Sequence, residues 1–121
     1  MYQLSIDLMI SASHQLRGYQ GPCQRIHGHN WKVQVVIQSD TLNSIGMVID
    51  FKDLTDLAWQ VVGRFDHQML NEIEPFNKIN PTAENMSRYF FKEIARLLPS
   101  GVKMKAIRLW ETPKYMVEYT E

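Results

Sequence analysis

A histidine pair at the start of an alternating segment constrains this chain more than any other feature. His27 and His29 open a stretch over 27–38 in which apolar and polar residues alternate, as in a β-strand with one buried face. Residues i and i+2 of a strand point to the same face, so both imidazoles can reach one point, and Gly28 between them leaves that approach open. We therefore expect half of a metal site here, with the chain's only cysteine, Cys23, just upstream.

Three further segments show strand patterns. Apolar residues alternate over 2–10, which predicts a first strand with one buried face. Residues 102–111 and 115–119 predict two more strands joined by a tight turn at 112–114. The apolar alternation changes phase near Ala106, which indicates a β-bulge.

Two amphipathic helices are predicted between the strand pairs, over 51–65 and 82–98, with Asp50 and Thr82 as their N-caps. The predicted order is ββααββ in a single domain over 1–121. It implies an α+β fold in which two helices cover one face of an antiparallel four-stranded sheet. The apolar sheet edges would be open in a monomer, so we expect a homo-oligomer.

The composition excludes several classes of function. Thirteen basic residues balance thirteen acidic ones, which argues against a general nucleic-acid or membrane-surface binder. We find no signal peptide at the N-terminus and no apolar run of transmembrane length. One cysteine cannot form an intramolecular disulfide, so a cytoplasmic location is expected.

A metal site needs a third ligand, and His14 is the best candidate. It follows the first strand, which could pair with the second through a wide hairpin and bring His14 beside His27 and His29. Three neutral imidazoles with an open fourth position are the ligand set of a catalytic zinc ion. The alternative is that His27 and His29 are only two polar residues at a strand entrance.

Cys23 and the Asp66–His67 pair allow several interpretations. Cys23 could be a fourth zinc ligand, a thiolate base or nucleophile, or an inert small apolar residue. With Asp66 and His67 it could form a proton relay in which the imidazole moves the proton and the carboxylate orients the ring. The pair could equally be a polar cluster at the end of a helix.

Glu111 is a carboxylate at the end of a largely apolar strand, where it needs a partner. Its two oxygens suit a bidentate N–H edge, such as a guanidinium group or an aminopyrimidinone ring. The alternative partner is one of the lysine or arginine side chains of the chain itself.

Six short motifs follow one another along the chain: Ser-Ala-Ser-His14, Cys23-x3-His27-Gly-His29-Asn-Trp-Lys-Val, Gly46-Met-Val-Ile-Asp50-Phe, Phe-Asp66-His67-Gln-Met-Leu-Asn71, Pro81-Thr-Ala-Glu-Asn85 and Trp110-Glu111-Thr112. In this order they resemble the 6-pyruvoyltetrahydropterin synthase family over nearly the whole chain. The resemblance implies a tunnelling (T) fold whose sheets join into a barrel across subunits. It also implies a homohexamer made of two trimers.

The resemblance further implies a Zn²⁺ cofactor, a catalytic relay and a pterin-binding group, with 7,8-dihydroneopterin triphosphate as the substrate. The implied residues are His14, His27 and His29 for zinc, Cys23, Asp66 and His67 for catalysis, and Glu111, Thr112 and Thr82 for the substrate.

The Cys-x3-His-Gly-His spacing is similar to that of the bacterial 6-carboxy-5,6,7,8-tetrahydropterin synthases within this family. The resemblance to that branch implies a carbon–carbon lyase of queuosine and 7-deazapurine biosynthesis, which releases acetaldehyde and triphosphate. One alternative is 6-pyruvoyltetrahydropterin synthase or sepiapterin-forming activity on the same substrate. A second is a non-catalytic zinc module in which Cys23 joins three histidines as a ligand.

Overall fold

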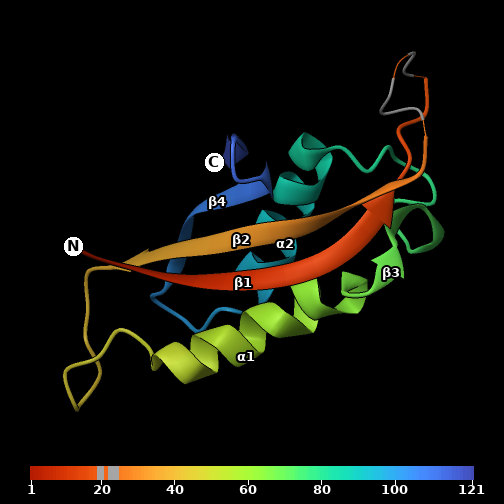
Figure 1. The fold of residues 1–121 in the computed structure, drawn as a ribbon. Coiled ribbons are helices and arrows are strands. Elements are labelled where there is room, and N and C mark those ends of the chain that lie inside the picture. The colour runs from red at the N-terminus through yellow and green to blue at the C-terminus, as the bar shows by residue number, and fades with distance from the viewer. Residues whose placement is uncertain (19–20, 22–24) are drawn as a thin grey trace.

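Two helices cover one face of an open, mainly antiparallel sheet (Figure 1). The computed structural model describes residues 1–18, 21 and 25–121, so Cys23 lies outside the described residues. The sheet order is β3-β1-β2-β4-β5. The elements are β1 (Tyr2–His14), β2 (His27–Ser39), α1 (Phe51–Val62), the 3₁₀ turn η2 (Gly63–Phe65), β3 (Gln68–Met69), the 3₁₀ turn η3 (Leu70–Glu72), α2 (Ala83–Leu97), β4 (Lys103–Thr112) and β5 (Tyr115–Tyr119).

β1 and β2 pair antiparallel over their whole length, from Tyr2 opposite Ser39 to His14 opposite His27. β1 is longer than the predicted 2–10 because its buried alternation continues through Ala12 to His14. The expectation that His14 lies in a connecting segment is therefore wrong: it is the last residue of a strand.

A fifth strand is present where the sequence predicts four. β3 pairs parallel to β1, with Ala12 opposite Gln68 and Ser13 opposite Met69. Two residues are too few to display a period-two pattern, so this strand leaves no recognisable signal in the sequence. Its position beside β1 fixes the segment that carries Asp66 and His67.

The bulge predicted near Ala106 is confirmed. Val36 of β2 is opposite Ala106 of β4, whereas its neighbour Ile37 is opposite Met104. Lys105 is therefore the extra residue, and the apolar alternation of β4 changes phase around it.

The helix boundaries follow their caps. The Asp50 carboxylate accepts a hydrogen bond from the Lys52 N–H at the start of α1 (2.7 Å). The Thr82 hydroxyl accepts one from the Asn85 N–H at the start of α2 (3.1 Å). The first helix ends at Val62, three residues before the predicted end, and the tighter turn η2 continues it.

The core lies between the helices and the inner face of the sheet. Trp31, Phe65, Phe76 and Phe90 are all fully buried within it. Burying a side chain of this size stabilises the fold by about 2–3 kcal/mol. Neither of the two helices that the structure describes is long and apolar enough to cross a membrane.

Candidate metal centre and relay

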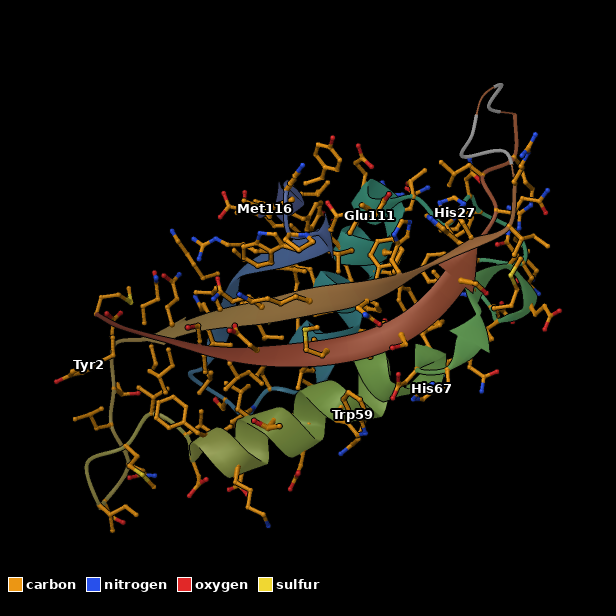
Figure 2. The ribbon with its side chains drawn as sticks, in the orientation of Figure 1. Tyr2, His27, Trp59, His67, Glu111 and Met116 are labelled. Atoms are coloured by element: carbon orange, nitrogen blue, oxygen red, sulfur yellow. The ribbon has the colours of Figure 1, made fainter. Side chains whose placement is uncertain are left out.

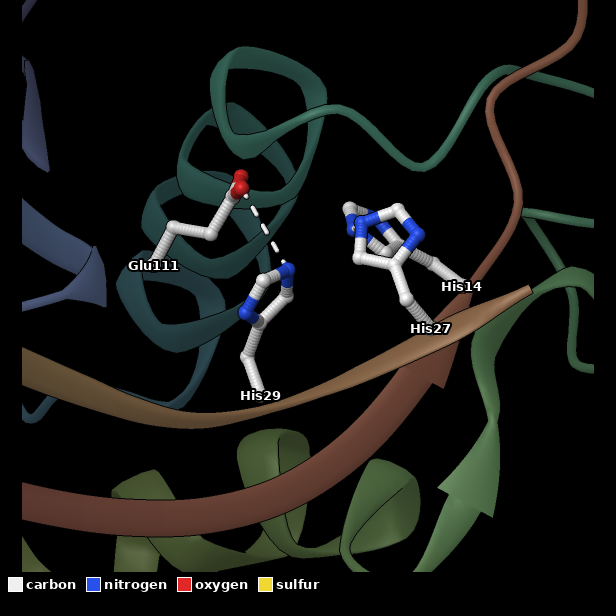
Figure 3. Close-up of side chains that lie close together, drawn as sticks. All are labelled: His14, His27, His29 and Glu111. Atoms are coloured by element: carbon white, nitrogen blue, oxygen red, sulfur yellow. Dashed lines mark hydrogen bonds and ion pairs between the residues drawn. The ribbon is translucent and has the colours of Figure 1, made fainter. Parts of the chain in front are cut away.

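Three imidazoles meet where β1 ends and β2 begins. His14 lies opposite His27 in the strand register, and His29 follows two residues later on the same face. The ring of His14 lies 4.5 Å from that of His27 and 5.3 Å from that of His29, measured between centroids. Figure 3 shows the three rings together, with the Glu111 carboxylate beside His29.

Backbone carbonyl groups orient two of these rings. His14 Nδ1 lies 2.8 Å from the Pro81 carbonyl oxygen, and His27 Nδ1 lies 2.6 Å from that of Arg25. Because a carbonyl oxygen only accepts, each Nδ1 carries the hydrogen, and the Nε2 of a neutral ring bears a lone pair. Those two Nε2 atoms are 3.0 Å apart. The arrangement suits a cation placed between them.

His29 completes the group with a buried nitrogen that has no hydrogen-bond partner among the described residues. Its Nε2 lies 3.3 Å from Oε1 of Glu111, within ion-pair distance but without hydrogen-bond geometry. A buried polar atom without a partner normally costs about 1–3 kcal/mol, which a bound cation would offset. The structure thus pairs Glu111 with an imidazole rather than with a described lysine or arginine.

Burial favours the neutral form of two of these imidazoles, His14 and His29. It lowers the pKa of His14, and the hydrogen bond to Pro81 opposes this lowering only in part. Burial likewise lowers the pKa of His29 against the opposing charge of Glu111. The neutral imidazole is the form that binds a metal ion.

The donor set fits a divalent metal ion. One ligand atom from each of His14, His27, His29 and Glu111 lies within 4.8 Å of all the others. Imidazole nitrogens with one carboxylate oxygen are typical zinc ligands. The sequence predicts the three histidines as a set, whereas it assigns Glu111 to the substrate. The carbonyl groups of Pro81 and Arg25 are missed, because a backbone group leaves no residue-type signal.

A second bulge in β4 places Glu111. Trp110 is opposite Met116 of β5, and Thr112 is opposite Tyr115, so Glu111 is the extra residue between them. A bulged residue is unpaired and its side chain can be re-aimed. Here the bulge accompanies a carboxylate that points at His29.

Asp66 and His67 are hydrogen-bonded to Ser11 on the β3 side of β1. The Ser11 N–H donates to Asp66 Oδ1 (2.9 Å), and the His67 N–H donates to the Ser11 carbonyl (2.6 Å). His67 has a left-handed backbone with φ of 59°, an uncommon conformation for a residue with a side chain. Its side chain is 80% exposed, and its Nε2 lies 3.7 Å from Asp66 Oδ1.

The described chain does not bring this pair into contact with the imidazole cluster. Asp66 and His67 lie on the β3 side of β1, whereas Glu111 comes from β4, beyond β2 (Figure 2). An open cavity of about 440 Å³ has both His29 and His67 in its lining. Cys23, the third predicted member of the relay, is outside the described residues.

The two predicted substrate-binding threonines flank the centre. Thr82 follows Pro81, the residue that orients His14, and its hydroxyl caps α2. Thr112 follows Glu111, and its hydroxyl accepts a hydrogen bond from the Lys114 N–H in the turn to β5 (3.2 Å).

Arg17 has a structural role. Its guanidinium donates to the carbonyl groups of Phe76 (2.5 Å) and Ile79 (3.3 Å). The Asn80 side chain bonds both the N–H and the carbonyl of Arg17. These bonds tie the chain after His14 to the segment that ends at Pro81.

Fold and site together define a small α+β protein with a histidine-rich centre that could hold a metal ion. Residues 3–121 match the protein-family model described as 6-pyruvoyl tetrahydropterin synthase. The chain belongs to that family.

Curated relatives match most or all of the chain. It is 33% identical to a 6-carboxy-5,6,7,8-tetrahydropterin synthase of Haemophilus influenzae, and the match covers 100% of both chains. It is 35% identical to a dihydroneopterin monophosphate aldolase of Pyrococcus furiosus, over 78% of each chain.

A solved structure shows the same fold. The 6-pyruvoyl tetrahydropterin synthase of Caenorhabditis elegans superposes with a TM-score of 0.88 at 25% identity, covering 99% of this chain and 95% of that one. The tunnelling fold predicted for the subunit is thereby confirmed.

Proposed function

We propose that this enzyme converts 7,8-dihydroneopterin triphosphate to 6-carboxy-5,6,7,8-tetrahydropterin, releasing acetaldehyde and triphosphate. It would act as a zinc-dependent carbon–carbon lyase in queuosine and 7-deazapurine biosynthesis. The observation that carries this proposal is the His14–His27 pair, whose Nε2 atoms lie 3.0 Å apart while the Nδ1 of each ring faces a backbone carbonyl oxygen. The Haemophilus influenzae relative, a 6-carboxy-5,6,7,8-tetrahydropterin synthase that matches over the whole chain, supports the reaction.

His14, His27 and His29 would hold the zinc ion through their Nε2 atoms. Zinc, when bound, supplies a Lewis acid that polarises oxygens of the substrate side chain. The carbonyl groups of Pro81 and Arg25 fix two of the rings, so their Nε2 atoms need little rearrangement before use.

Cys23, Asp66 and His67 would move protons on the substrate side chain. Asp66 Oδ1 is held by the Ser11 N–H, and His67 presents an exposed Nε2 close to it. A carboxylate beside an imidazole can orient the ring for proton transfer to or from the substrate.

Glu111 would hold the N–H edge of the pterin ring, with Thr82 and Thr112 nearby. Two parallel carboxylate oxygens match two parallel N–H donors, which orients the ring as well as binding it. Orientation matters because the reacting carbons must be held close to the residues that act on them.

Assembly into a homohexamer of two trimers, with sheets joined into barrels, is part of the proposal. β1 pairs with β3 only at Ala12 and Ser13, and β5 forms the opposite edge of the described sheet. Met9 is 58% exposed on β1, and Tyr115 is 67% exposed on β5. Open strand edges of this kind are usually paired in an assembly. Sedimentation analysis measures the mass directly, and a monomer at micromolar concentration would contradict this part.

The decisive experiment is product identification. Zinc-loaded protein is incubated with 7,8-dihydroneopterin triphosphate, and the products are analysed by mass spectrometry, with acetaldehyde trapped as a hydrazone. We expect 6-carboxytetrahydropterin and acetaldehyde in equal amounts from the wild type, and neither from His27→Ala. Absence of turnover by the wild-type protein would disprove the proposal.

The same assay separates the alternatives. A pyruvoyl or sepiapterin product would place the chain in another branch of its family. The aldolase relative makes the monophosphate substrate worth including, and faster cleavage of the monophosphate would favour that activity. A non-catalytic zinc module predicts that Cys23→Ala loses zinc, whereas the lyase predicts that it keeps zinc and loses turnover.

A further inference from the structure

We infer that Glu111 has two partners in turn: the metal ion together with the three imidazoles when no substrate is present, and the pterin ring after substrate binds. The second partner rests on the proposed function. The first rests on the geometry of the centre alone. Glu111 would thus be a removable ligand as well as an anchor for the ring.

The distances favour ligation in the substrate-free enzyme. Neighbouring ligand atoms in a four-coordinate zinc site are about 3.3 Å apart, as follows from metal–ligand distances near 2.0–2.1 Å in a tetrahedron. Glu111 Oε1 lies 3.3 Å from His29 Nε2, and the Nε2 atoms of His14 and His27 are 3.0 Å apart. All four donors already stand within 4.8 Å of one another.

The charges favour the same arrangement. The Glu111 carboxylate faces His29 Nε2, a buried nitrogen without a hydrogen-bond partner among the described residues. A partly buried carboxylate in this position is stabilised by a positive charge beside it. A divalent cation supplies it and takes up the unpaired nitrogen at the same time.

The backbone around Glu111 allows the side chain to leave. Pairing between β2 and β4 ends at Lys32 and Trp110, and pairing between β4 and β5 passes from Trp110 to Thr112. Glu111 is therefore outside both described ladders, and its side chain is 28% exposed. Turning this carboxylate from His29 to a ring breaks no strand pairing.

One carboxylate shared between two partners makes their binding antagonistic. If pterin draws Glu111 away from the imidazoles, pterin weakens zinc binding, and zinc weakens pterin binding by the same factor. Pterin without a side chain is the suitable probe, because it offers the N–H edge and no side-chain oxygens to replace the carboxylate.

The test measures metal binding without turnover. Dissociation constants for Zn²⁺ are obtained by competition with a chelator, and visible spectra are recorded with Co²⁺ in place of zinc. Glu111→Gln should raise the Zn²⁺ dissociation constant about tenfold or more and change the Co²⁺ spectrum. Glu118→Gln is the matched control, since it removes the same charge from the neighbouring strand β5, and it should behave as the wild type.

Pterin should raise the Zn²⁺ dissociation constant of the wild type and shift its Co²⁺ spectrum toward that of Glu111→Gln. It should have neither effect on Glu111→Gln. Wild-type Zn²⁺ affinity and an unchanged Co²⁺ spectrum in Glu111→Gln would overturn the ligand role. A wild-type Co²⁺ spectrum that does not respond to saturating pterin would overturn the exchange.

Failure of the proposed function is distinguishable from failure of this inference. If Glu111→Gln loses Zn²⁺ affinity and pterin shifts the spectrum, the inference holds even when no lyase product forms. If the wild type forms product while Glu111→Gln binds Zn²⁺ as tightly as the wild type, the inference fails and the proposed function stands.

Discussion

His14 and His27 hold their Nε2 atoms 3.0 Å apart while the Nδ1 of each ring donates to a backbone carbonyl group. Two neutral rings in these tautomers present lone pairs to each other, so the folded chain has a ready position for a cation. Binding to the folded state alone raises the free energy of unfolding.

Zinc should therefore stabilise the protein. At a free Zn²⁺ concentration one hundred times the dissociation constant, the gain is about 2.7 kcal/mol. Urea denaturation with and without Zn²⁺ measures it, and His27→Ala should lose the gain. His67→Ala is the control that keeps it, because no described contact joins His67 to the imidazole cluster. An equal gain in His27→Ala would place the cation elsewhere.

Metal-free protein should lose stability as the pH falls below the ordinary histidine pKa of 6.5. Burial lowers the folded-state pKa of His14 and His29, so the unfolded chain binds more protons between those lowered values and 6.5. The contribution is fully present above 6.5 and is lost as the pH falls toward the folded-state values. Urea denaturation of the apo-protein between about pH 5 and pH 8 checks this. His14→Gln should show a shallower slope, and a slope equal to that of the wild type would contradict the assignment.

The His67→Gly variant should be more stable than the His67→Ala variant. The φ of 59° at His67 lies in the left-handed region, which costs a residue with a Cβ atom roughly 1 kcal/mol and glycine very little. We expect the free energy of unfolding of His67→Gly to exceed that of His67→Ala by about 1 kcal/mol. Because the side chain is mostly exposed, few lost contacts complicate the comparison. The reverse order of stability would show that the residue has a different backbone conformation in solution.

Asp66 allows its structural role to be separated from its proposed proton-transfer role. Asp66→Asn keeps the oxygen that accepts from the Ser11 N–H, so its stability should stay within about 0.5 kcal/mol of the wild type. Asp66→Ala loses that bond and should be destabilised by about 1 kcal/mol or more. Under the proposed function both variants should lose about 100-fold or more in kcat. An Asp66→Asn variant with full turnover would remove Asp66 from the relay.

Much of the architecture could be predicted from sequence because its causes are local. The alternation of β1 and β2 and the caps Asp50 and Thr82 depend on residues close in the chain. The meeting of His14 with His27 followed from the hairpin that those two strands form. The end of β1 was harder to predict, because its last buried residue is the polar His14 rather than an apolar one.

The rest of the site depends on pairings between distant segments. The bulge at Glu111 is visible only in the register of β4 against β5. The left-handed backbone of His67 accompanies its hydrogen bond to the distant Ser11 carbonyl. The proximity of Glu111 to His29 follows from these tertiary relationships, so residue type alone suggested a different partner. The position of Asp66 and His67 across the sheet from Glu111 was likewise not visible in their spacing.

The continuous register from Tyr2 to His14 also bears on the order in which the parts of the site form during folding. His14 and His27 come opposite each other as soon as the β1–β2 hairpin closes, and hairpins form in about 1–10 microseconds. Glu111 arrives only when β4 docks against β2, a contact between residues far apart in sequence and therefore slower to form. A nascent chain would bring its first two candidate metal ligands together early and add the Glu111 carboxylate late, so a cation that binds the two imidazoles would do so before the sheet is complete.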